Sequence, residues 1–345
     1  MHILLLTQYY KPESVGAAIW LSELVDELTT VGHEVTVLTG FPNHPTGRVF
    51  EGYGGKFFQR EAISGTQIIR TWLYATPRKT FWARAVGFFS FTISSLLGGL
   101  IAVKRADVIY TILQPLTLGM TAVMLAKKTR ARVVLNIQDI HPQAAVAVGA
   151  LRNRRIIRCL EWLERWNYRH ADHMVVISEG FRQNLIGKGV PAEKVSVVPN
   201  WADPGFIQPG PKDNDFRQEI NVGSTFTLVY SGGLTHNSNL EPVIEAAQIL
   251  RNDPFSFVIV GDGVRKADLQ QLAQEKNLSN VQFKPFQPLE RYPDVLRAAD
   301  MNLVTLSTQA ALVSVPSKIF KQMAAGRPVL AIAAKGTLEF CGNFA

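Results

Sequence analysis

Cysteine is scarce in this sequence: its 345 residues contain two cysteines, Cys159 and Cys341, which lie 182 positions apart. Two such distant thiols do not form the disulfide framework of a small secreted scaffold, and they are typical of a reducing compartment. Charged residues make up 19% of the chain, whereas hydrophobic residues make up 47%. That composition excludes a disordered chain, because so many apolar side chains can offset the entropy lost on folding. The length predicts two domains of about 150 residues each.

Several signature motifs are missing as well. Residues 9–18 follow the first expected strand and read YYKPESVGAA, which is neither GxGxxG nor a P-loop. The sequence therefore contains neither of the motifs that usually indicate hydride transfer or NTP hydrolysis. No DxD-type metal motif follows an expected strand. The apolar run 1–7 is too short for a secretion signal, so we expect a cytoplasmic chain.

The chain is basic, and the excess charge lies in its first part. Lys and Arg number 36 against 28 Asp and Glu, which gives a formal charge of +8. Residues 1–200 carry 23 basic and 14 acidic side chains, whereas the remainder carries 13 and 14. This asymmetry favours an anionic partner for the first part, namely nucleic acid, a phospholipid surface or a phosphorylated substrate. An ordinary basic surface without a partner is the alternative.

Apolar runs without polar alternation recur along the chain and are separated by helical segments. That pattern is typical of an α/β protein, in which parallel strands are buried between helices. A break at residues 199–204 (PNWADP) separates two such series, which predicts domains over 1–200 and 201–345. The expected strands are Ile3–Thr7, Glu34–Thr39, Gln67–Thr71, Val108–Thr111, Arg132–Ile137, His173–Ile177, Val195–Val198, Thr225–Ser231, Ser256–Val260, Val281–Phe283, Met301–Thr305 and Pro328–Ile332. The expected helices include Ala17–Thr30, Arg155–His170, Leu240–Leu250, Lys266–Lys276, Glu290–Ala298 and Ser317–Ala325.

The segment from Ala85 to Val103 contains nineteen residues and no charge, and basic residues flank it on both sides. Its length just reaches the ~18–20 residues that span a bilayer. Three interpretations stay open: a spanning helix, a helix buried in the domain, and a helix with one face on the core and an aromatic end at a membrane surface. The basic charge of the first domain favours the third. The candidate membrane or acceptor contacts are Phe81, Trp82, Arg84, Phe88 and Phe89.

Polar residues after the expected strands of the first domain are candidate site residues. Asp139 and His141 follow the strand Arg132–Ile137, where a carboxylate and an imidazole can assist proton removal from an attacking hydroxyl. The alternative is that Asp139 caps the next helix. Gly16 precedes a helix and can expose amides to an anion, or it belongs to a simple turn. His44 lies in the loop after the second strand and is a binding candidate.

Glycines follow two expected strands of the second domain and can let a phosphate approach the backbone. A stronger pattern is Pro316 at the start of a helix, Gly326 at its end and Pro328 before the next strand. A diphosphate at that helix N-terminus meets free amides, and Lys318 adds positive charge. The candidate phosphate-binding residues here are Gly232, Gly233, Gly261, Asp262, Gly263, Arg265, Pro316, Ser317 and Lys318.

Taken together, these residues resemble family 4 of the retaining glycosyltransferases, whose members have the GT-B arrangement. The resemblance rests on Pro12-Glu13 with Gly16, on residues 32–37 (GHEVTV), 199–200 (PN) and 261–263 (GDG), and on residues 316–328. These pieces recur in family order over nearly the whole chain. Residues 134–139 and 310–326 are most similar to the colanic-acid type of exopolysaccharide glycosyltransferases. The resemblance implies two Rossmann-like domains that face each other across a cleft, the first binding the acceptor and the second the nucleotide-sugar.

The implied reaction moves a sugar from a nucleotide-sugar donor to a polyprenyl-diphosphate-linked saccharide, with retention of configuration and without a metal. The nucleotide-sugar is a substrate, so no cofactor is implied. The implied place is the cytoplasmic side of the inner membrane surface. Gly16 lies near the donor phosphate, and Asp139 and His141 lie near the reacting sugar. Nucleic acid is not an expected partner, because no recognised binding motif is present.

This sequence departs from the family in three respects. The usual pair of glutamates falls on Val313 and Lys321, and a Lys cannot accept the ribose hydroxyl hydrogen bonds. The usual phosphate-clamping Arg and Lys fall on Gly233 and Asn237. Family members usually continue with a further strand and helix, so we expect an incomplete second domain. A catalytically impaired scaffold of a polysaccharide assembly complex and a GT-B epimerase or phosphorylase are therefore kept as alternatives.

Overall fold

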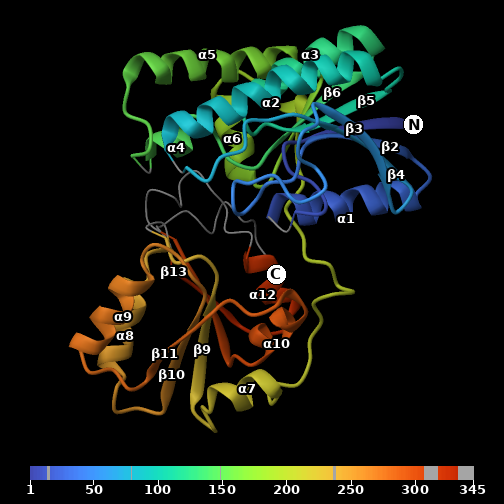
Figure 1. Ribbon diagram of the computed structural model, residues 1–345. Coiled ribbons are helices and arrows are strands. Elements are labelled where there is room, and N and C mark those ends of the chain that lie inside the picture. Colours follow the sequence, from blue (N-terminus) through green and yellow to red (C-terminus); the bar gives the residue numbers. More distant parts are fainter. Residues whose placement is uncertain (14–15, 79, 148, 236–237, 307–317, 333–345) are drawn as a thin grey trace. The chain divides into compact units, whose positions relative to one another are not determined.

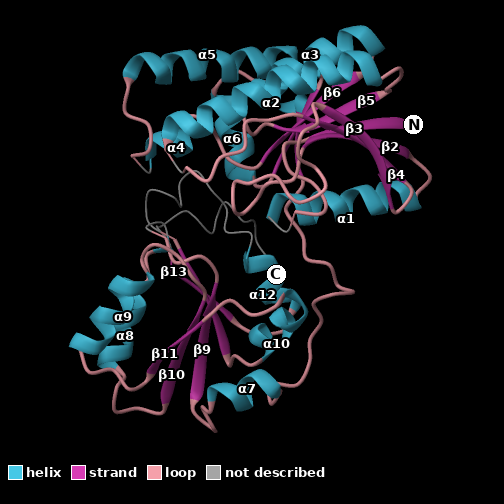
Figure 2. Ribbon diagram, viewed as in Figure 1, coloured by secondary structure: helices cyan, strands magenta, loops and turns pink. Residues whose placement is uncertain are grey.

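The computed structural model describes residues 1–345 apart from 14–15, 79, 148, 236–237, 307–317 and 333–345. The chain divides into two compact units, Met1–Pro199 and Asn200–Ala345. In each unit, helices alternate with the strands of one sheet (Figures 1 and 2). This architecture confirms the predicted α/β class with two Rossmann-like sheets. The assignment of an acceptor role to one unit and a donor role to the other stays a prediction.

The first unit is built on an eight-stranded sheet in the order β3-β4-β2-β1-β5-β6-β7-β8. All neighbouring strands are parallel except the hairpin of β3 and β4. The strand order reverses between β1 and β5, which lie side by side at the centre. The strands are β1 (His2–Leu6), β2 (Glu34–Gly40), β3 (Phe58–Ile63), β4 (Thr66–Thr71), β5 (Val108–Ile112), β6 (Arg132–Ile137), β7 (His173–Val176) and β8 (Val195–Val197).

Helices cover both faces of this sheet, as Figure 1 shows, with α1 (Gly16–Thr30) on one face and α2, α3 and α5 on the other. The turn after α1 needs Gly32, which has φ +87° and allows the His33 amide to bond the Leu28 carbonyl. The other helices of this unit are α2 (Phe81–Ala102), α3 (Thr117–Thr129), α4 (Gln143–Ala147), α5 (Arg154–His170), α6 (Glu179–Gly187) and the 3-10 helix Ala192–Lys194.

The second unit has a five-stranded parallel sheet in the order β11-β10-β9-β12-β13, which reverses between β9 and β12. Apolar side chains on its two faces pack in two separate clusters, one with α8 and α9 and the other with α7 and α10. The elements are α7 (Asp215–Ile220), β9 (Phe226–Ser231), α8 (Glu241–Ile249), β10 (Phe255–Val260), α9 (Lys266–Glu275), β11 (Val281–Lys284), the 3-10 helix Leu289–Arg291, α10 (Tyr292–Arg297), β12 (Met301–Thr305), α12 (Lys318–Ala324) and β13 (Val329–Ile332).

The expected strands and helices agree with the structure to within one residue at each described end, except that the expected helix Glu290–Ala298 starts two residues before α10, within the 3-10 helix Leu289–Arg291. Strand β3 is not among the strands that the sequence predicts. It is an edge strand of alternating exposure and joins β4 through Ser64 and Gly65, which have φ of 50° and 81°. Such a two-residue turn with positive φ is the signal that predicts a hairpin. The residues after 332 lie outside the described part, so the expected incompleteness of the second domain stays a prediction.

Helix α2 packs against the sheet and α3 by one face only. Phe91 and Ser95 are fully buried there, and a Cβ on Gly98 would lie 2.5 Å from the Thr71 methyl group. The opposite face is exposed and apolar, so the interpretation of a helix buried in the domain is wrong for that face. By length and composition, Trp82–Ala102 is the candidate membrane span among the helices that the structure describes. We call the exposed face the α2 stripe; its members are Trp82, Val86, Phe89, Ile93, Leu97 and Ile101.

Candidate active site

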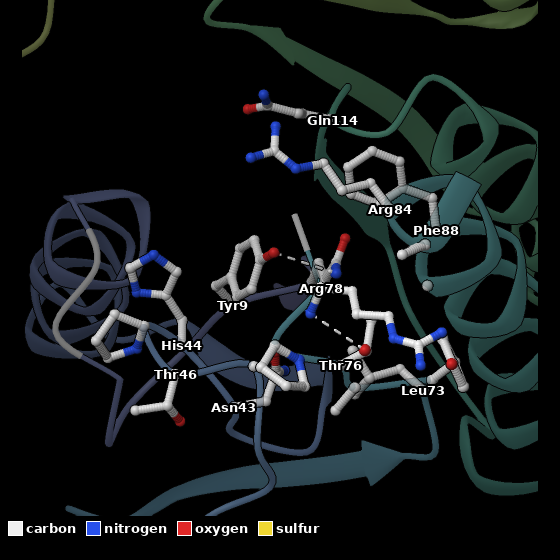
Figure 3. A pocket seen from close by; sticks show the side chains of 18 of the residues that line it. Tyr9, Asn43, His44, Thr46, Leu73, Thr76, Arg78, Arg84, Phe88 and Gln114 are labelled. Atoms are coloured by element: carbon white, nitrogen blue, oxygen red, sulfur yellow. Dashed lines mark hydrogen bonds between the residues drawn. The ribbon is translucent and has the colours of Figure 1, made fainter. Parts of the chain in front are cut away.

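The first unit contains a cavity of about 560 Å³ at the carboxyl ends of its central strands. Residues 7–9 follow β1 and contribute to one wall, while Ile112 and Gln114 contribute at the end of β5. The loops after β2 and β4 and the first turns of α2 complete the lining (Figure 3). Because β1 and β5 flank the reversal of strand order, the cavity lies where open α/β sheets bind their ligands.

The cavity wall is polar and carries positive charge. Arg78 and Arg84 line it, and none of the described lining residues is Asp or Glu. His44 lies across from Tyr9, with 5.9 Å between the ring centroids and an edge-to-face arrangement (Figure 3). Burial lowers the pKa of His44 and raises that of Tyr9, so both rings are neutral near pH 7. The predicted binding residue His44 therefore lies in a site with cations and neutral hydrogen-bonding groups, which suits an anionic, hydroxyl-rich ligand.

Glu13 holds two loops of this cavity together. One carboxylate oxygen accepts hydrogen bonds from the amides of Asn43 and His44 at 2.9 Å each, and the other accepts from the Tyr10 amide at 3.3 Å. The residue is 3% exposed. Burial raises the pKa of Glu13, although these backbone donors and the charge of Arg70 lower it in part. Glu13 thus joins the loop after β1 to the loop after β2 and sets the position of His44.

Arg70 supports the same region from β4. Its side chain is fully buried, and its Nε lies 2.5 Å from a carboxylate oxygen of Glu61 on β3. The guanidinium also donates to the carbonyls of Gly40 and Lys11, so it connects β2 with the turn after β1. No role for Arg70 could be predicted from the sequence, because nothing in the pattern around it shows that its strand carries a buried cation.

Gly47 allows the two outer loops of the cavity to touch. It has φ +70°, and a Cβ at this position would lie 2.1 Å from the Thr76 carbonyl oxygen. A side chain is therefore excluded both by the backbone conformation and by the neighbouring backbone. The Gly47 amide donates a hydrogen bond to the Asn43 carbonyl at 2.7 Å, which closes the same loop.

The structure separates the predicted residues of the first domain into two groups. Gly16 begins α1, and the next residue, Ala17, lines the cavity. Asp139 and His141 follow β6 as expected, but neither belongs to the described lining of the cavity. The His141 amide donates to the Asp139 carbonyl at 3.1 Å. Their proposed contact with the reacting sugar thus stays a prediction.

The predicted membrane or acceptor residues also divide. Arg84 and Phe88 line the cavity, whereas Trp82 and Phe89 are not part of its described lining and are 71% and 59% exposed. The side chain of Phe81 lies outside the described part. One helix therefore contributes to the cavity at its first turns and to an exposed apolar face along the rest of its length.

In the second unit, the loops after β9 and β10 pack against each other through their glycines. A Cβ on Gly261 would lie 1.9 Å from the Gly232 carbonyl oxygen, and a Cβ on Gly263 would lie 2.3 Å from that of Leu234. The Gly232 amide donates to the Val260 carbonyl at 2.8 Å. These glycines are required by close backbone packing, while Gly233 has no such close neighbour.

Lys318 joins this glycine cluster from the start of α12. Its Nζ donates to the Tyr230 hydroxyl at 3.1 Å and lies 4.6 Å from the centre of that ring. A Cβ on Gly232 would lie 1.8 Å from the same Nζ, so Gly232 leaves the space that the ammonium fills. Burial lowers the pKa of Lys318 to about 8. Among the described residues, no carboxylate forms an ion pair with it, which leaves this cation available for an anionic ligand.

Two other candidates near the glycine cluster, Arg265 and Asp262, already interact with neighbouring groups of the protein. Arg265 forms ion pairs with Glu241 at 2.6 Å and with Asp268 at 3.1 Å. A carboxylate oxygen of Asp262 accepts from the Gly263 amide at 2.7 Å. Arg265 is thus already neutralised by carboxylates. Pro316 and Ser317 lie outside the described residues.

Comparisons with known proteins agree with this geometry. Residues 15–201 match the family described as glycosyl transferase 4-like domain, and residues 211–345 match glycosyl transferases group 1. The chain is 33% identical to WcaI of Escherichia coli (strain K12), a glycosyl transferase named for colanic acid biosynthesis, over 94% of this chain and 82% of WcaI. It is 28% identical to the glycosyltransferase WbjE of Pseudomonas aeruginosa over 68% of this chain and 59% of WbjE.

The fold has solved counterparts as well. The structure of Anabaena HepE in complex with UDP and glucose superimposes with a TM-score of 0.65 at 18% identity. The match covers 98% of this chain and 82% of HepE. At this identity the likeness concerns the GT-B fold alone. The two family matches together with the identity to WcaI show that this chain belongs to the glycosyltransferases, as a member with a glycosyl transferase 4-like first domain and a group 1 second domain.

Proposed function

We propose that this chain transfers a sugar from a nucleotide-sugar to a lipid-linked saccharide in the biosynthesis of a cell-surface polysaccharide. The observation that carries the proposal is that α2 contributes both to the cavity and to an exposed apolar face. Its first turns place Arg84 and Phe88 in a basic cavity, and its remaining length exposes the α2 stripe. An acceptor with a diphosphate and a polyprenyl chain presents the matching pair of surfaces, one anionic and one apolar. The name of WcaI, which refers to colanic acid, supports a polysaccharide product.

The cavity of the first unit is the proposed acceptor site. Arg78 and Arg84 provide positive charge for a diphosphate, since guanidinium groups bind phosphate through paired N–H donors. Asn43, His44 and Gln114 provide neutral hydrogen-bonding groups for saccharide hydroxyls. The volume of about 560 Å³ is of the size of small-molecule sites.

The α2 stripe is the proposed contact with the inner face of the plasma membrane. Its six apolar residues recur at intervals of three or four, which places them on one side of the helix. The Trp72 carbonyl accepts a hydrogen bond from Ser94 of this helix, and the ring of Trp72 lies 5.8 Å from that of Phe57, which is 78% exposed. An exposed apolar helix face with aromatic residues is typical of helices that lie in a membrane interface.

The second unit is the proposed donor site. Lys318 at the start of α12 offers a cation to a diphosphate, and the first amides of that helix are the proposed backbone donors. The complex of HepE with UDP supports a nucleotide ligand in this arrangement. We propose that charge neutralisation needs no metal, because Lys318 supplies positive charge. The nucleotide-sugar is consumed as a substrate, and no cofactor is proposed.

The proposed transfer proceeds with retention of configuration. The acceptor hydroxyl attacks the anomeric carbon on the face from which the nucleoside diphosphate departs. The bond from that carbon to the diphosphate oxygen breaks, the bond to the acceptor oxygen forms, and the hydroxyl proton passes to the departing diphosphate. Asp139 and His141 are the residues proposed near the reacting sugar. Lys318 and the backbone amides stabilise the charge that develops on the leaving group.

Incubation with labelled nucleotide-sugars and a membrane lipid extract tests this function. We expect label in a lipid-soluble product with one donor, a higher acceptor KM for Arg84→Gln and a higher donor KM for Lys318→Gln. Absence of both transfer and donor hydrolysis with every common donor would contradict the proposal. Nucleotide binding without turnover would instead favour the scaffold alternative, and an epimerised sugar or a sugar phosphate would favour the other enzyme classes.

A further inference from the structure

Helix α5 has an outward face that the proposed reaction does not use. Its inner side is fixed: Glu164 is 2% exposed and pairs with Lys188 at 2.6 Å, and the Asn167 amide donates to the Leu116 carbonyl at 2.8 Å. Every residue of α5 that is exposed is Arg, His, Cys or Trp. These residues are Arg154, Arg155, Arg158, Cys159, Trp162, Arg165, Arg169 and His170.

Five of these positions form one row along the helix, which we call the α5 ridge. Arg155, Arg158, Trp162, Arg165 and Arg169 recur at intervals of three or four residues, so they lie on one side. The row from the first to the last is about 21 Å long at 1.5 Å per residue. Trp162 is 56% exposed. Among the described residues, none of the four arginines of the ridge has a carboxylate partner.

The four arginines of the ridge outnumber the nearby Glu161, which lies one helical turn from Arg158 and from Arg165. Guanidinium groups in a row repel one another, and that arrangement is stabilised by an anionic surface. At 0.15 M salt the screening length is about 8 Å, so each arginine must itself lie close to an anion. The neighbouring elements decide which kind of anionic surface fits. Helix α3 packs against both α2 and α5, and Figure 1 shows all three helices on the same face of the sheet. The α5 ridge and the α2 stripe thus belong to one helical layer.

We infer that the α5 ridge binds the anionic headgroups of the membrane whose apolar region receives the α2 stripe. A bilayer interface offers phosphates and apolar chains within a few ångströms of each other, which matches a layer with one cationic and one apolar helix. A nucleic acid would meet the ridge but would leave the α2 stripe in water. Arginine and tryptophan are the side chains suited to this depth, because each combines an apolar body with a polar end. This inference rests on the membrane contact of the proposed function and adds its lipid chemistry.

Vesicle co-sedimentation of the full chain tests the inference without any sugar substrate. The probes are phosphatidylcholine vesicles with and without ~30% phosphatidylglycerol. The test variant is R158Q/R165Q on the ridge, and the matched control is R132Q/R251Q, which removes two exposed charges elsewhere. At ~1 kcal/mol for each basic residue at an anionic surface, we expect the ridge variant to lose roughly 10- to 30-fold in partition onto the anionic vesicles. We expect the control to lose less than about 3-fold, and R158K/R165K to bind like the natural chain.

Equal losses for the ridge variant and the control would overturn the inference, as would equal binding to vesicles with and without the anionic lipid. Tighter binding of the ridge to duplex DNA than to anionic vesicles at the same salt would overturn it too. Transfer activity is read separately. Loss of sugar transfer with unchanged vesicle binding would contradict the proposed reaction and leave the ridge assignment intact.

Discussion

Buried charges of single residues shape both candidate sites. In the first unit the carboxylate of Glu13 receives three backbone amides from two loops, and in the second unit Lys318 is a cation without a described carboxylate partner. Neither arrangement stabilises a hydrophobic core. Each fixes the geometry or the charge of a place where a ligand would bind, and each leads to a prediction about one residue.

Replacement of Glu13 by Gln should loosen the cavity of the first unit. The amide keeps one acceptor but turns an N–H group toward backbone donors, which leaves buried amides unsatisfied. We expect a loss of about 1–3 kcal/mol in the free energy of unfolding, measured by denaturant titration. Glu51→Gln, at an exposed turn, is the control and should change stability by less than about 0.5 kcal/mol. Equal stability of the two variants would show that Glu13 does not hold the loops.

The lowered pKa of Lys318 predicts a pH-dependent affinity for nucleoside diphosphates. Its pKa is about 8 instead of the ordinary 10.5, so the charged form that attracts phosphate is lost as pH rises through about 8. We expect constant affinity below that pH and a decline above it, measured by calorimetric titration with UDP and GDP between pH 6.5 and 9.5. Lys318→Gln should bind the nucleotides more weakly and with an affinity that changes little with pH. Lys276→Gln, directly after α9, should keep the pH dependence of the natural chain. A decline that persists in Lys318→Gln would assign the titration to another group.

At the scale of elements, α2 combines two tasks that depend on different sides of one helix. Gly98 and Phe91 fix its inner side, whereas the α2 stripe adds nothing to the described core. Ile93 and Ile101 are 60% and 76% exposed, so their replacement by Ser should change the free energy of unfolding by less than about 0.5 kcal/mol each. The same I93S/I101S variant should bind vesicles of any charge more weakly, because apolar area leaves the interface.

The control for this variant is I249S/V264S, which changes two exposed apolar residues of the second unit. It should match I93S/I101S in stability and the natural chain in vesicle binding. A large loss of stability in I93S/I101S would show that the stripe is covered within the protein. That result would remove the membrane contact from the account.

Most strands and helices could be predicted from the sequence, because strands that are buried in a parallel sheet consist of continuous runs of apolar residues. Strand β3 could not be found by that rule, because it is an exposed edge strand and only the Ser64–Gly65 turn marks it. The residues of the candidate sites were harder to predict from the sequence than the strands and helices. Strand ends and helix starts are visible in sequence, so the positions of Gly16 and Arg84 beside the first-unit cavity and of Lys318 at the start of α12 could be predicted, whereas the ligands assigned to them, including the donor phosphate assigned to Gly16, stay predictions. The roles of Glu13 and Arg70 depend on contacts between loops 30 and 59 positions apart, which no local pattern shows.

At the scale of the whole molecule, we propose that one unit receives a lipid-linked acceptor and the other a nucleotide-sugar. The most direct measurement is transfer of a labelled sugar from each common nucleotide-sugar to a membrane lipid extract, with the lipid product identified by mass and its anomeric configuration by NMR. We expect one donor whose sugar is found, with retained anomeric configuration, on a polyprenyl-diphosphate saccharide. A chain that binds nucleotide yet transfers to no lipid with any donor would contradict it.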